Sequence, residues 1–270
     1  MRGILTYHSI DPSGSPISVA PEAFAAHARF LASGGVRVVP LAELAQPRED
    51  EGGDALAITF DDGFANFASH AWPVLREHGL PATLFVVTDR AGGTNAWDGA
   101  PGLAIPELPL LSWPDLARLA GEGLDLGAHG RTHASLRGLP RERLEAEVAG
   151  SRDRIREETG RTPAAFAYPF GDVDDAAAAA AKAAFACAVT TRLALLAPGE
   201  DRHLLPRIDA YYLRENDRLQ DFGSAGFRRW LGVRGAARRA GSLMRRTLGK
   251  ADAAPTMEPR DADAEDDRGA

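Results

Sequence analysis

Short apolar runs alternate with amphipathic stretches over about the first 212 residues of the chain. An apolar run of this length is typical of a strand buried in a parallel sheet. The predicted strands are Ile4–Tyr7, Val36–Val39, Ala55–Phe60, Thr83–Val87, Leu124–Ala128, Ala165–Tyr168, Ala186–Thr190 and Arg207–Tyr211.

The stretches between these runs have the spacing and end signals of helices. Pro140 opens one of them and Gly160 follows it, and Asp174 is a good N-cap for another. The predicted helices are Pro21–Ala32, Asn66–His78, Trp113–Gly121, Pro140–Glu158 and Asp174–Ala184. This alternation predicts an α/β fold with a distorted or incomplete (β/α) barrel of about seven to eight parallel strands.

The last 50 residues have a different character, so we divide the chain into residues 1–222, 223–250 and 251–270. Residues 223–250 are basic, contain no acids and carry interleaved apolar residues, which predicts one or two amphipathic helices. Such a segment could dock on an anionic membrane, or pack on the barrel with a solvated arginine face. We favour packing, because four glycines weaken a continuous helix. Residues 251–270 are acidic and poor in apolar residues, so we expect disorder there.

Charge and composition exclude some classes of function and indicate a compartment. The net charge of -7 argues against a nucleic-acid binder. The single cysteine, Cys187, cannot form an intramolecular disulfide. The chain has neither a run of about 20 apolar residues nor the features of a signal peptide. We therefore expect a cytoplasmic protein, peripheral at the inner face of the membrane if 223–250 docks there.

Two adjacent acids, Asp61 and Asp62, end the run Ala55–Phe60 and precede Gly63. Adjacent like charges repel and contribute nothing to packing, but a cation beside them makes the arrangement favourable. The glycine allows a sharp turn and a close approach. The pair therefore suggests a metal site with one carboxylate as ligand and the other free for proton transfer. A solvated turn at the end of a strand is the alternative.

Two histidines follow another predicted strand. His129 and His133 are four residues apart, a spacing that lets both reach one cation. Together with Asp62 they would form a set of two histidines and one carboxylate that leaves coordination positions open for water and substrate. Two structural histidines are the alternative.

These motifs resemble the polysaccharide deacetylases, carbohydrate esterases built on the NodB homology domain. The resemblance is carried by Thr59-Phe60-Asp61-Asp62-Gly63, by Leu111-Ser112-Trp113-Pro114-Asp115-Leu116, by His129-x-x-x-His133, and by Ala165-Phe166-Ala167-Tyr168-Pro169-Phe170-Gly171. It covers roughly residues 3 to 212, and it identifies 1–222 as the catalytic domain. Gly130 departs from the family pattern, which has Ser or Thr after the first histidine. We expect both ligands to keep their places on a different local backbone.

The resemblance implies a role for each motif. Asp62, His129 and His133 would bind a divalent metal, most often Zn²⁺, and Asp61 would be the general base. The segment Tyr168, Pro169, Phe170 and Gly171 would contact substrate and stabilise the oxyanion, through the backbone amide of Phe170 or Gly171. Arg207, which together with Asp209 resembles a charged pair of the family, would keep Asp61 ionised if the two lie close.

The general acid is the weakest point of the resemblance. The family places a histidine in a Leu-x-His motif near the end of the domain, and no such motif is present here. His203 precedes a strand, so it should lie at the opposite end of the barrel. His8 follows the first strand, as in relatives with permuted motifs that act on poly-N-acetylglucosamine, and we predict that it is the acid. A buried histidine bonded to a loop carbonyl is the alternative.

The predicted function is therefore metal-dependent removal of N-acetyl groups from an amino-sugar polymer, oligosaccharide or lipid-linked glycan. The alternatives are an amide or imide hydrolase that uses the same site on a non-sugar substrate, and a carbohydrate-binding protein without catalysis. The presence of Asp61 argues against the second alternative, because a binder needs no base. The sequence gives no oligomeric state.

Overall fold

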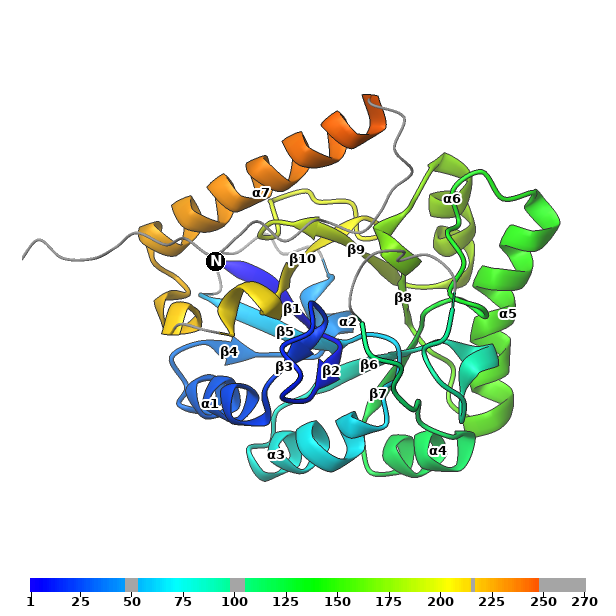
Figure 1. Ribbon diagram of the computed structural model, residues 1–270, viewed down its shortest axis with the longest axis horizontal. Coiled ribbons are helices and arrows are strands. Elements are labelled where there is room, and N and C mark those ends of the chain that lie inside the picture. The colour runs from blue at the N-terminus through cyan, green and yellow to red at the C-terminus, as the bar shows by residue number, and fades with distance from the viewer. Residues whose placement is uncertain (47–52, 98–104, 215–216, 248–270) are drawn as a thin grey trace, which may run out of the picture.

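Parallel strands close into a barrel at the centre of the molecule (Figure 1). The computed structural model describes residues 1–46, 53–97, 105–214 and 217–247. Within these residues the ring consists of β1 (Arg2–Tyr7), β10 (Leu205–Asp209), β9 (Cys187–Leu193), β8 (Ala165–Ala167), β7 (Asp125–Ala128), β6 (Ala82–Val86) and β5 (Ala55–Phe60). Pairing of β1 with β5 closes the ring, and β4 (Arg37–Val38) pairs with the start of β5. The predicted (β/α) barrel is confirmed.

Alternating side chains on the strands divide the core into two parts. On β5, Ala55 and Ala57 face one cluster, which includes Ile4 and Phe85, whereas Leu56 and Ile58 face another cluster packed against the helices. Helix α2 (Leu41–Leu44) contributes to the first cluster. Small residues at these inward positions fit the narrow interior of a barrel of this size.

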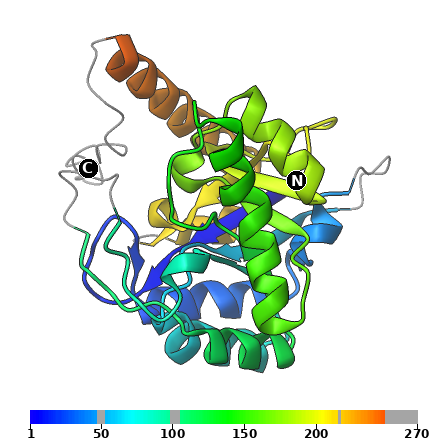
Figure 2. The same cartoon turned by 90° about the vertical axis from the view of Figure 1, so that its right-hand side faces the viewer.

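Helices surround the barrel (Figures 1 and 2). They are α1 (Pro21–Ala32), α3 (Trp72–Glu77), α4 (Trp113–Gly121), α5 (Arg141–Thr159) and α6 (Asp175–Ala184), with short 3₁₀ turns at Thr88–Arg90, Pro169–Gly171, Ala210–Leu213 and Asp217–Asp221. The predicted caps are present: the Asp174 carboxylate accepts the N–H of Ala177, and Gly160 ends α5 with φ of 69°. A small pair of strands, β2 (Ser9–Ile10) and β3 (Ser18–Val19), was not predicted.

Several predicted elements differ in extent from the structure; the strand predicted at Ala186–Thr190, for example, is Cys187–Leu193. The predicted helix Asn66–His78 begins as a π-helical turn, Phe67–Ala71, and only α3 is α-helical. Pro73 has no N–H to donate, so the regular α-helical ladder cannot continue through this position. The strand predicted at Arg207–Tyr211 lies two residues earlier. It stops at Asp209, whose carboxylate accepts the N–H of Tyr211 and starts a 3₁₀ turn.

The basic segment forms one helix, α7 (Ala225–Thr247), along the flank of the barrel (Figure 1). Phe227 and Leu231 are buried, as expected for a terminal helix that packs on the barrel. At Gly235 the helix backbone approaches Leu193 so closely that an added Cβ would lie 2.5 Å from its carbonyl oxygen. None of the described helices is both long and apolar enough to cross a bilayer. The predicted disordered tail, 251–270, lies outside the described residues.

Two glycines of α7 should respond in opposite directions to substitution by alanine. Gly235→Ala should lower the free energy of unfolding by about 1–3 kcal/mol, because the new methyl group overlaps the Leu193 carbonyl oxygen. Gly232→Ala, with no atom within 4 Å of the new Cβ, should raise it by about 0.5–1 kcal/mol. Urea unfolding measures both changes. An increase in stability for Gly235→Ala would show that α7 does not pack this tightly.

Candidate metal and catalytic site

The predicted site residues converge where the barrel strands end. Asp61 and Asp62 follow β5, His129 and His133 follow β7, and His8 follows β1. The carboxyl ends of parallel strands share one rim, where the active sites of (β/α) barrels lie. The structure therefore brings together residues that are up to 125 positions apart in the sequence, 133 − 8.

Asp62, His129 and His133 form a buried cluster with the geometry of a metal site. The Nε2 atoms of both histidines lie 3.4 Å from Oδ1 of Asp62. One ligand atom from each of the three residues falls within 4.8 Å of the other two. A single cation placed between these atoms could contact all three, and three protein ligands are the usual number for a catalytic zinc.

The hydrogen-bonding pattern of the cluster fits a cation. The Nδ1–H of His129 donates to the carbonyl oxygen of Ala167 at 2.8 Å, which leaves Nε2 directed at Asp62. Burial disfavours the charged ring, but the carboxylates of Asp62 and Asp61 outweigh it and raise the pKa of His129, so a metal at this position would take the place of the Nε2 proton. Burial lowers the pKa of His133 to about 3, so its ring is neutral. Oδ1 of Asp62 is buried and accepts no hydrogen bond from the described residues. Acceptors that face one another are stabilised by a positive ion between them, so this donor set suits a divalent metal.

The backbone around the cluster is strained. Asp62, His133 and Phe170 have φ of 72°, 65° and 59°, and they are the non-glycine residues with positive φ in the described part of the chain. Such conformations cost of order 1–3 kcal/mol each and tend to gather at functional sites. Two of the three are proposed metal ligands, and the third packs its ring edge-on against His133 with centroids 4.5 Å apart.

Asp61 lies beside this cluster, and its carboxylate is held by a buried arginine. Arg207, also buried, holds it with two hydrogen bonds of 2.7 and 2.6 Å from its two terminal nitrogens. The same guanidinium donates to the Thr190 carbonyl and to the hydroxyls of Thr6 and Thr59. Burial alone would raise the pKa of Asp61, but the charge and hydrogen bonds of Arg207 hold it well below its usual range. Asp61 is therefore ionised at neutral pH.

His8 lies beside Asp61 at the mouth of the site. Its Nε2 is 3.8 Å from Oδ2 of Asp61, and its side chain is 24% exposed against 3% for Asp61. His203, the alternative acid, is buried and donates from Nε2 to the carbonyl oxygen of Phe185, just before β9 begins. The predicted position of His203 at the opposite end of the barrel is what the structure shows. Of the two candidate acids, His8 is the one that lies close to Asp61.

The Tyr168–Gly171 segment contributes less than the sequence suggested. The Tyr168 side chain is buried in the core and its hydroxyl donates to the His203 carbonyl, so the prediction that it contacts substrate is wrong for this side chain. Pro169 has no N–H, and the Gly171 N–H donates to the Tyr168 carbonyl. The Phe170 N–H has no acceptor among the described residues. It is the donor of this segment that remains available for an oxyanion.

Trp97 is a site residue that the sequence analysis missed. Its ring lies against the His133 ring with centroids 4.4 Å apart and an angle of 33° between the planes. Phe170 contacts the same imidazole, so two aromatic rings fix the orientation of this ligand. Trp97 is partly exposed. No local motif marks it, because it lies in a long connection between β6 and α4 and is adjacent in space only.

Glu147 is a second residue missed from the sequence, and it braces the histidine loop. It is 3% exposed on α5, and one carboxylate oxygen accepts the backbone N–H groups of Arg131 and Thr132 at 2.7 and 3.0 Å. The other oxygen accepts the Thr132 hydroxyl at 2.7 Å. Both residues lie between the two histidines in the sequence. An acid on the apolar stripe of Leu144 and Val148 was the signal that could have revealed it.

The brace also accounts for Gly130. This residue has φ of 76°, and an added Cβ would lie 3.1 Å from a carboxylate oxygen of Glu147. A Ser or Thr at this position would be strained and would crowd the carboxylate. The loop therefore takes its support from a distant glutamate where the family pattern has a local hydroxyl.

Removing the brace should weaken metal binding. We expect Glu147→Ala to lower Zn²⁺ affinity by roughly 10–100-fold, because the loop that carries His129 and His133 loses three hydrogen bonds. Glu147→Gln keeps an acceptor oxygen for the backbone N–H groups and should lower the Zn²⁺ affinity much less. Competition titration with a Zn²⁺ chelator measures both, with circular dichroism as a check on folding. Equal affinities for wild type and a folded Glu147→Ala protein would contradict this role.

Comparison with known proteins agrees with the geometry. The polysaccharide deacetylase family profile matches residues 48–187, just over half of the chain. YxkH of Bacillus subtilis, assigned to the polysaccharide deacetylases, is 27% identical over 210 residues, covering 76% of this chain and 70% of its own. The poly-beta-1,6-N-acetyl-D-glucosamine N-deacetylase of Staphylococcus epidermidis is 28% identical over 161 residues, covering 56% and 53%.

A solved structure shows the same fold. BC0361, a polysaccharide deacetylase from Bacillus cereus, superposes with a TM-score of 0.64 at 24% identity, covering 77% of this chain and 64% of its own. This chain thus spans between about half and 70% of the length of these relatives. The family match includes Asp61, Asp62, His129, His133 and the segment that follows β8. The chain belongs to the polysaccharide deacetylase family of hydrolases.

Proposed function

We propose that this protein is a divalent-metal-dependent N-deacetylase of an N-acetylated amino-sugar polymer, oligosaccharide or lipid-linked glycan, with Zn²⁺ as its native metal. The observation that carries the proposal is the buried set of Asp62, His129 and His133 beside the ionised Asp61. The S. epidermidis relative, named for its action on poly-beta-1,6-N-acetyl-D-glucosamine, supports the substrate class.

The residues divide the chemistry among them. A divalent metal held by Asp62, His129 and His133 would act as a Lewis acid on the acetyl carbonyl and on an attacking water. Asp61 is the proton acceptor for that water, since its carboxylate is ionised and lies next to the ligand Asp62. The Phe170 N–H is the proposed donor to the oxygen on which negative charge develops.

His8 is the proposed donor of the proton to the leaving amine. It is the residue of this group that combines exposure to solvent with proximity to Asp61. A donor at the mouth of the site can exchange protons with water between turnovers, whereas the buried Asp61 cannot do so directly. Trp97 and Phe170 give the same region an apolar wall against which a sugar ring can pack.

The division of labour between the two aspartates can be tested on N-acetylglucosamine oligomers. Asp61→Asn should retain Zn²⁺ and lower kcat for acetate release at least a hundredfold, because the proton acceptor is gone. The Asp62→Ala, His129→Ala double variant and chelator-treated wild type should lose both metal and activity. Acetate release is measured by a coupled assay, and metal content by elemental analysis. Robust acetate release from the double variant would rule out the metal assignment.

A pair of histidine variants tests the general acid. His8→Asn should lower kcat by about 10²–10⁴-fold and leave the metal content unchanged. His203→Gln can place its amide nitrogen near the position of Nε2, which donates to the Phe185 carbonyl at the far end of the barrel, so it serves as a control with near wild-type kcat. An activated acetate ester, whose leaving group needs no proton, should restore much of the rate of His8→Asn. A full rate for His8→Asn on the oligomers would exclude it as the acid.

A further inference from the structure

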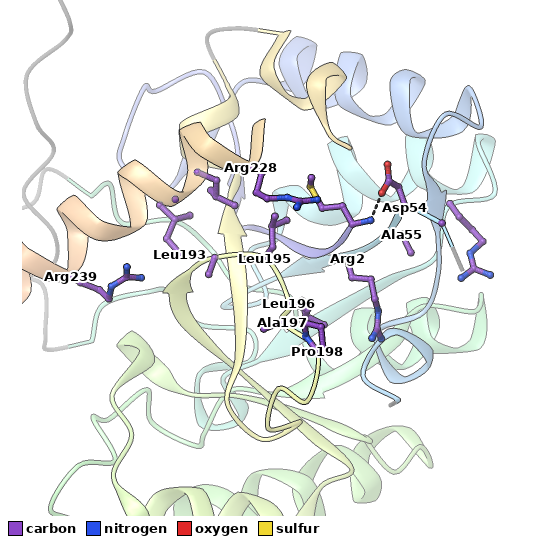
Figure 3. A pocket seen from close by; sticks show the side chains of 16 residues that line it. Arg2, Asp54, Ala55, Leu193, Leu195, Leu196, Ala197, Pro198, Arg228 and Arg239 are labelled. Carbon is purple, nitrogen blue, oxygen red and sulfur yellow. Dashed lines mark hydrogen bonds and ion pairs between the residues drawn. The ribbon is translucent and has the colours of Figure 1, made fainter. Parts of the chain in front are cut away.

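A cavity of about 970 Å³ opens on the flank of the barrel beneath α7 (Figure 3). Its floor is apolar, with Ala55 of β5, Leu231 of α7 and the segment from Leu193 to Pro198. This volume is at the upper end of the range for small-molecule sites. The metal and catalytic site described above is separate, because Asp61, Asp62, His129 and His133 do not line this cavity.

The rim of the cavity is positively charged. Among the described residues, Arg2, Arg37, Arg228 and Arg239 line it, together with the carboxylate of Asp54. That carboxylate forms an ion pair with the amino group of Met1, which offsets most of its negative charge at the rim. The Arg2 guanidinium donates to the backbone carbonyl oxygens of Leu44 and Gln46, which leaves Arg37 and Arg228 as the arginines considered for a ligand. Arginines at the edge of an apolar floor match a ligand with an anionic group at one end and an apolar body, because guanidinium binds phosphate through two parallel hydrogen bonds.

The adjoining surface of α7 has the same mixed character. Arg228 and Arg229 are exposed, the helix contains no acid from Ala225 to Thr247, and Val233 is 66% exposed. Val233 is the one large hydrophobic residue found exposed in the described part of the chain. A basic helix with an exposed apolar residue is typical of a surface that lies against anionic headgroups.

We propose that this cavity binds an anionic phospholipid and docks the protein on a negatively charged bilayer. Arg37 and Arg228 contact the phosphate, and the apolar floor takes the first part of an acyl chain. The acidic segment 251–270 has charge of the right sign, but its composition includes one large apolar residue, Met257, so it matches an apolar floor less well than an acyl chain does. A free phosphate likewise leaves the floor exposed to water.

Docking through this cavity leaves the catalytic site accessible. Strand β5 starts at the cavity with Ala55 and ends at Asp61 and Asp62, so the two sites are separated by about 20 Å, the length of six extended residues. The mouth of the site does not need to touch the membrane. This inference does not depend on the proposed deacetylase activity, and its test measures binding alone.

The test is co-sedimentation of the full chain with vesicles. Wild type should bind vesicles of phosphatidylglycerol and phosphatidylcholine and should not bind phosphatidylcholine alone. The Arg37→Gln, Arg228→Gln variant should bind the anionic vesicles roughly thirtyfold less tightly, from about 1 kcal/mol for each arginine near the surface. The Arg29→Gln, Arg143→Gln variant removes the same charge from exposed positions on α1 and α5 outside the cavity, and should stay within about twofold of wild type.

Several outcomes would overturn the proposal. They are the absence of wild-type binding, equal binding to neutral vesicles, and equal weakening of the two double variants. Release of the protein from vesicles by millimolar glycerol phosphate, a headgroup without acyl chains, would show a phosphate site instead. A more than fivefold gain in binding on deletion of 251–270 would show that the acidic segment is the resident occupant. A dimer that the cavity variant abolishes would show a second copy of the chain there.

Discussion

The site depends on the separation of two adjacent buried carboxylates. Asp61 and Asp62 are 2% and 6% exposed, and two like charges this close would strongly oppose each other's ionisation in a desolvated environment. The backbone solves this by placing Asp62 in a left-handed conformation followed by Gly63 with φ of 79°. Each carboxylate then has its own place for a positive partner: Arg207 holds Asp61, and Asp62 lies where a cation could be held together with His129 and His133. The remaining features of the site serve one or the other of these pairs.

The strained ligands are held in place from several directions at once. A residue with positive φ persists only where its surroundings stabilise that conformation. Around His133 these surroundings are the rings of Trp97 and Phe170 and the loop bonded to Glu147. The contacts come from elements that follow β6, β7 and β8 and from α5, so the histidine geometry is a property of the assembled barrel. The barrel must therefore be formed before the loop can hold a metal in this arrangement.

Most of the fold and the identity of the candidate ligands could be predicted because their signals are local. Apolar runs define the strands, and the order of strands in a parallel barrel carries Asp62 and His129 to one rim. The missed features depend on contacts between distant segments. Glu147 is 15 to 16 residues from the amides it binds, and Trp97 meets His133 through a long connection. Tyr168 lay in a recognised motif, yet it continues the extended backbone of β8 and shares the core face of Phe166, two residues earlier.

The predicted packing of α7 shows the same distinction between local and tertiary information. Its glycines argued against a continuous helix, because glycine weakens helices through the entropy of the unfolded backbone. At Gly235 the missing side chain allows the helix to approach Leu193 closely, and burial of Phe227 and Leu231 offsets the lost propensity. Glycine thus weakens this helix as an isolated segment and strengthens its contact with the barrel. Propensity describes only the first effect.

The contact between Arg207 and Asp61 imposes a compromise on the chemistry. A carboxylate whose pKa lies well below its usual range is always ionised near neutrality, but it is also a weak base. Without Arg207, the buried charge of Asp61 would face Asp62 uncompensated, at a cost of about 3–5 kcal/mol. The Arg207 contact thus lowers the basicity of Asp61 and, by the same interaction, allows two charged carboxylates to lie next to each other. A weak base suffices only if the water it deprotonates is unusually acidic, which is the chemistry that a divalent metal on Asp62 would supply. The low basicity of Asp61 and the unpaired Oδ1 of Asp62 are therefore two consequences of one requirement for a cation at this position.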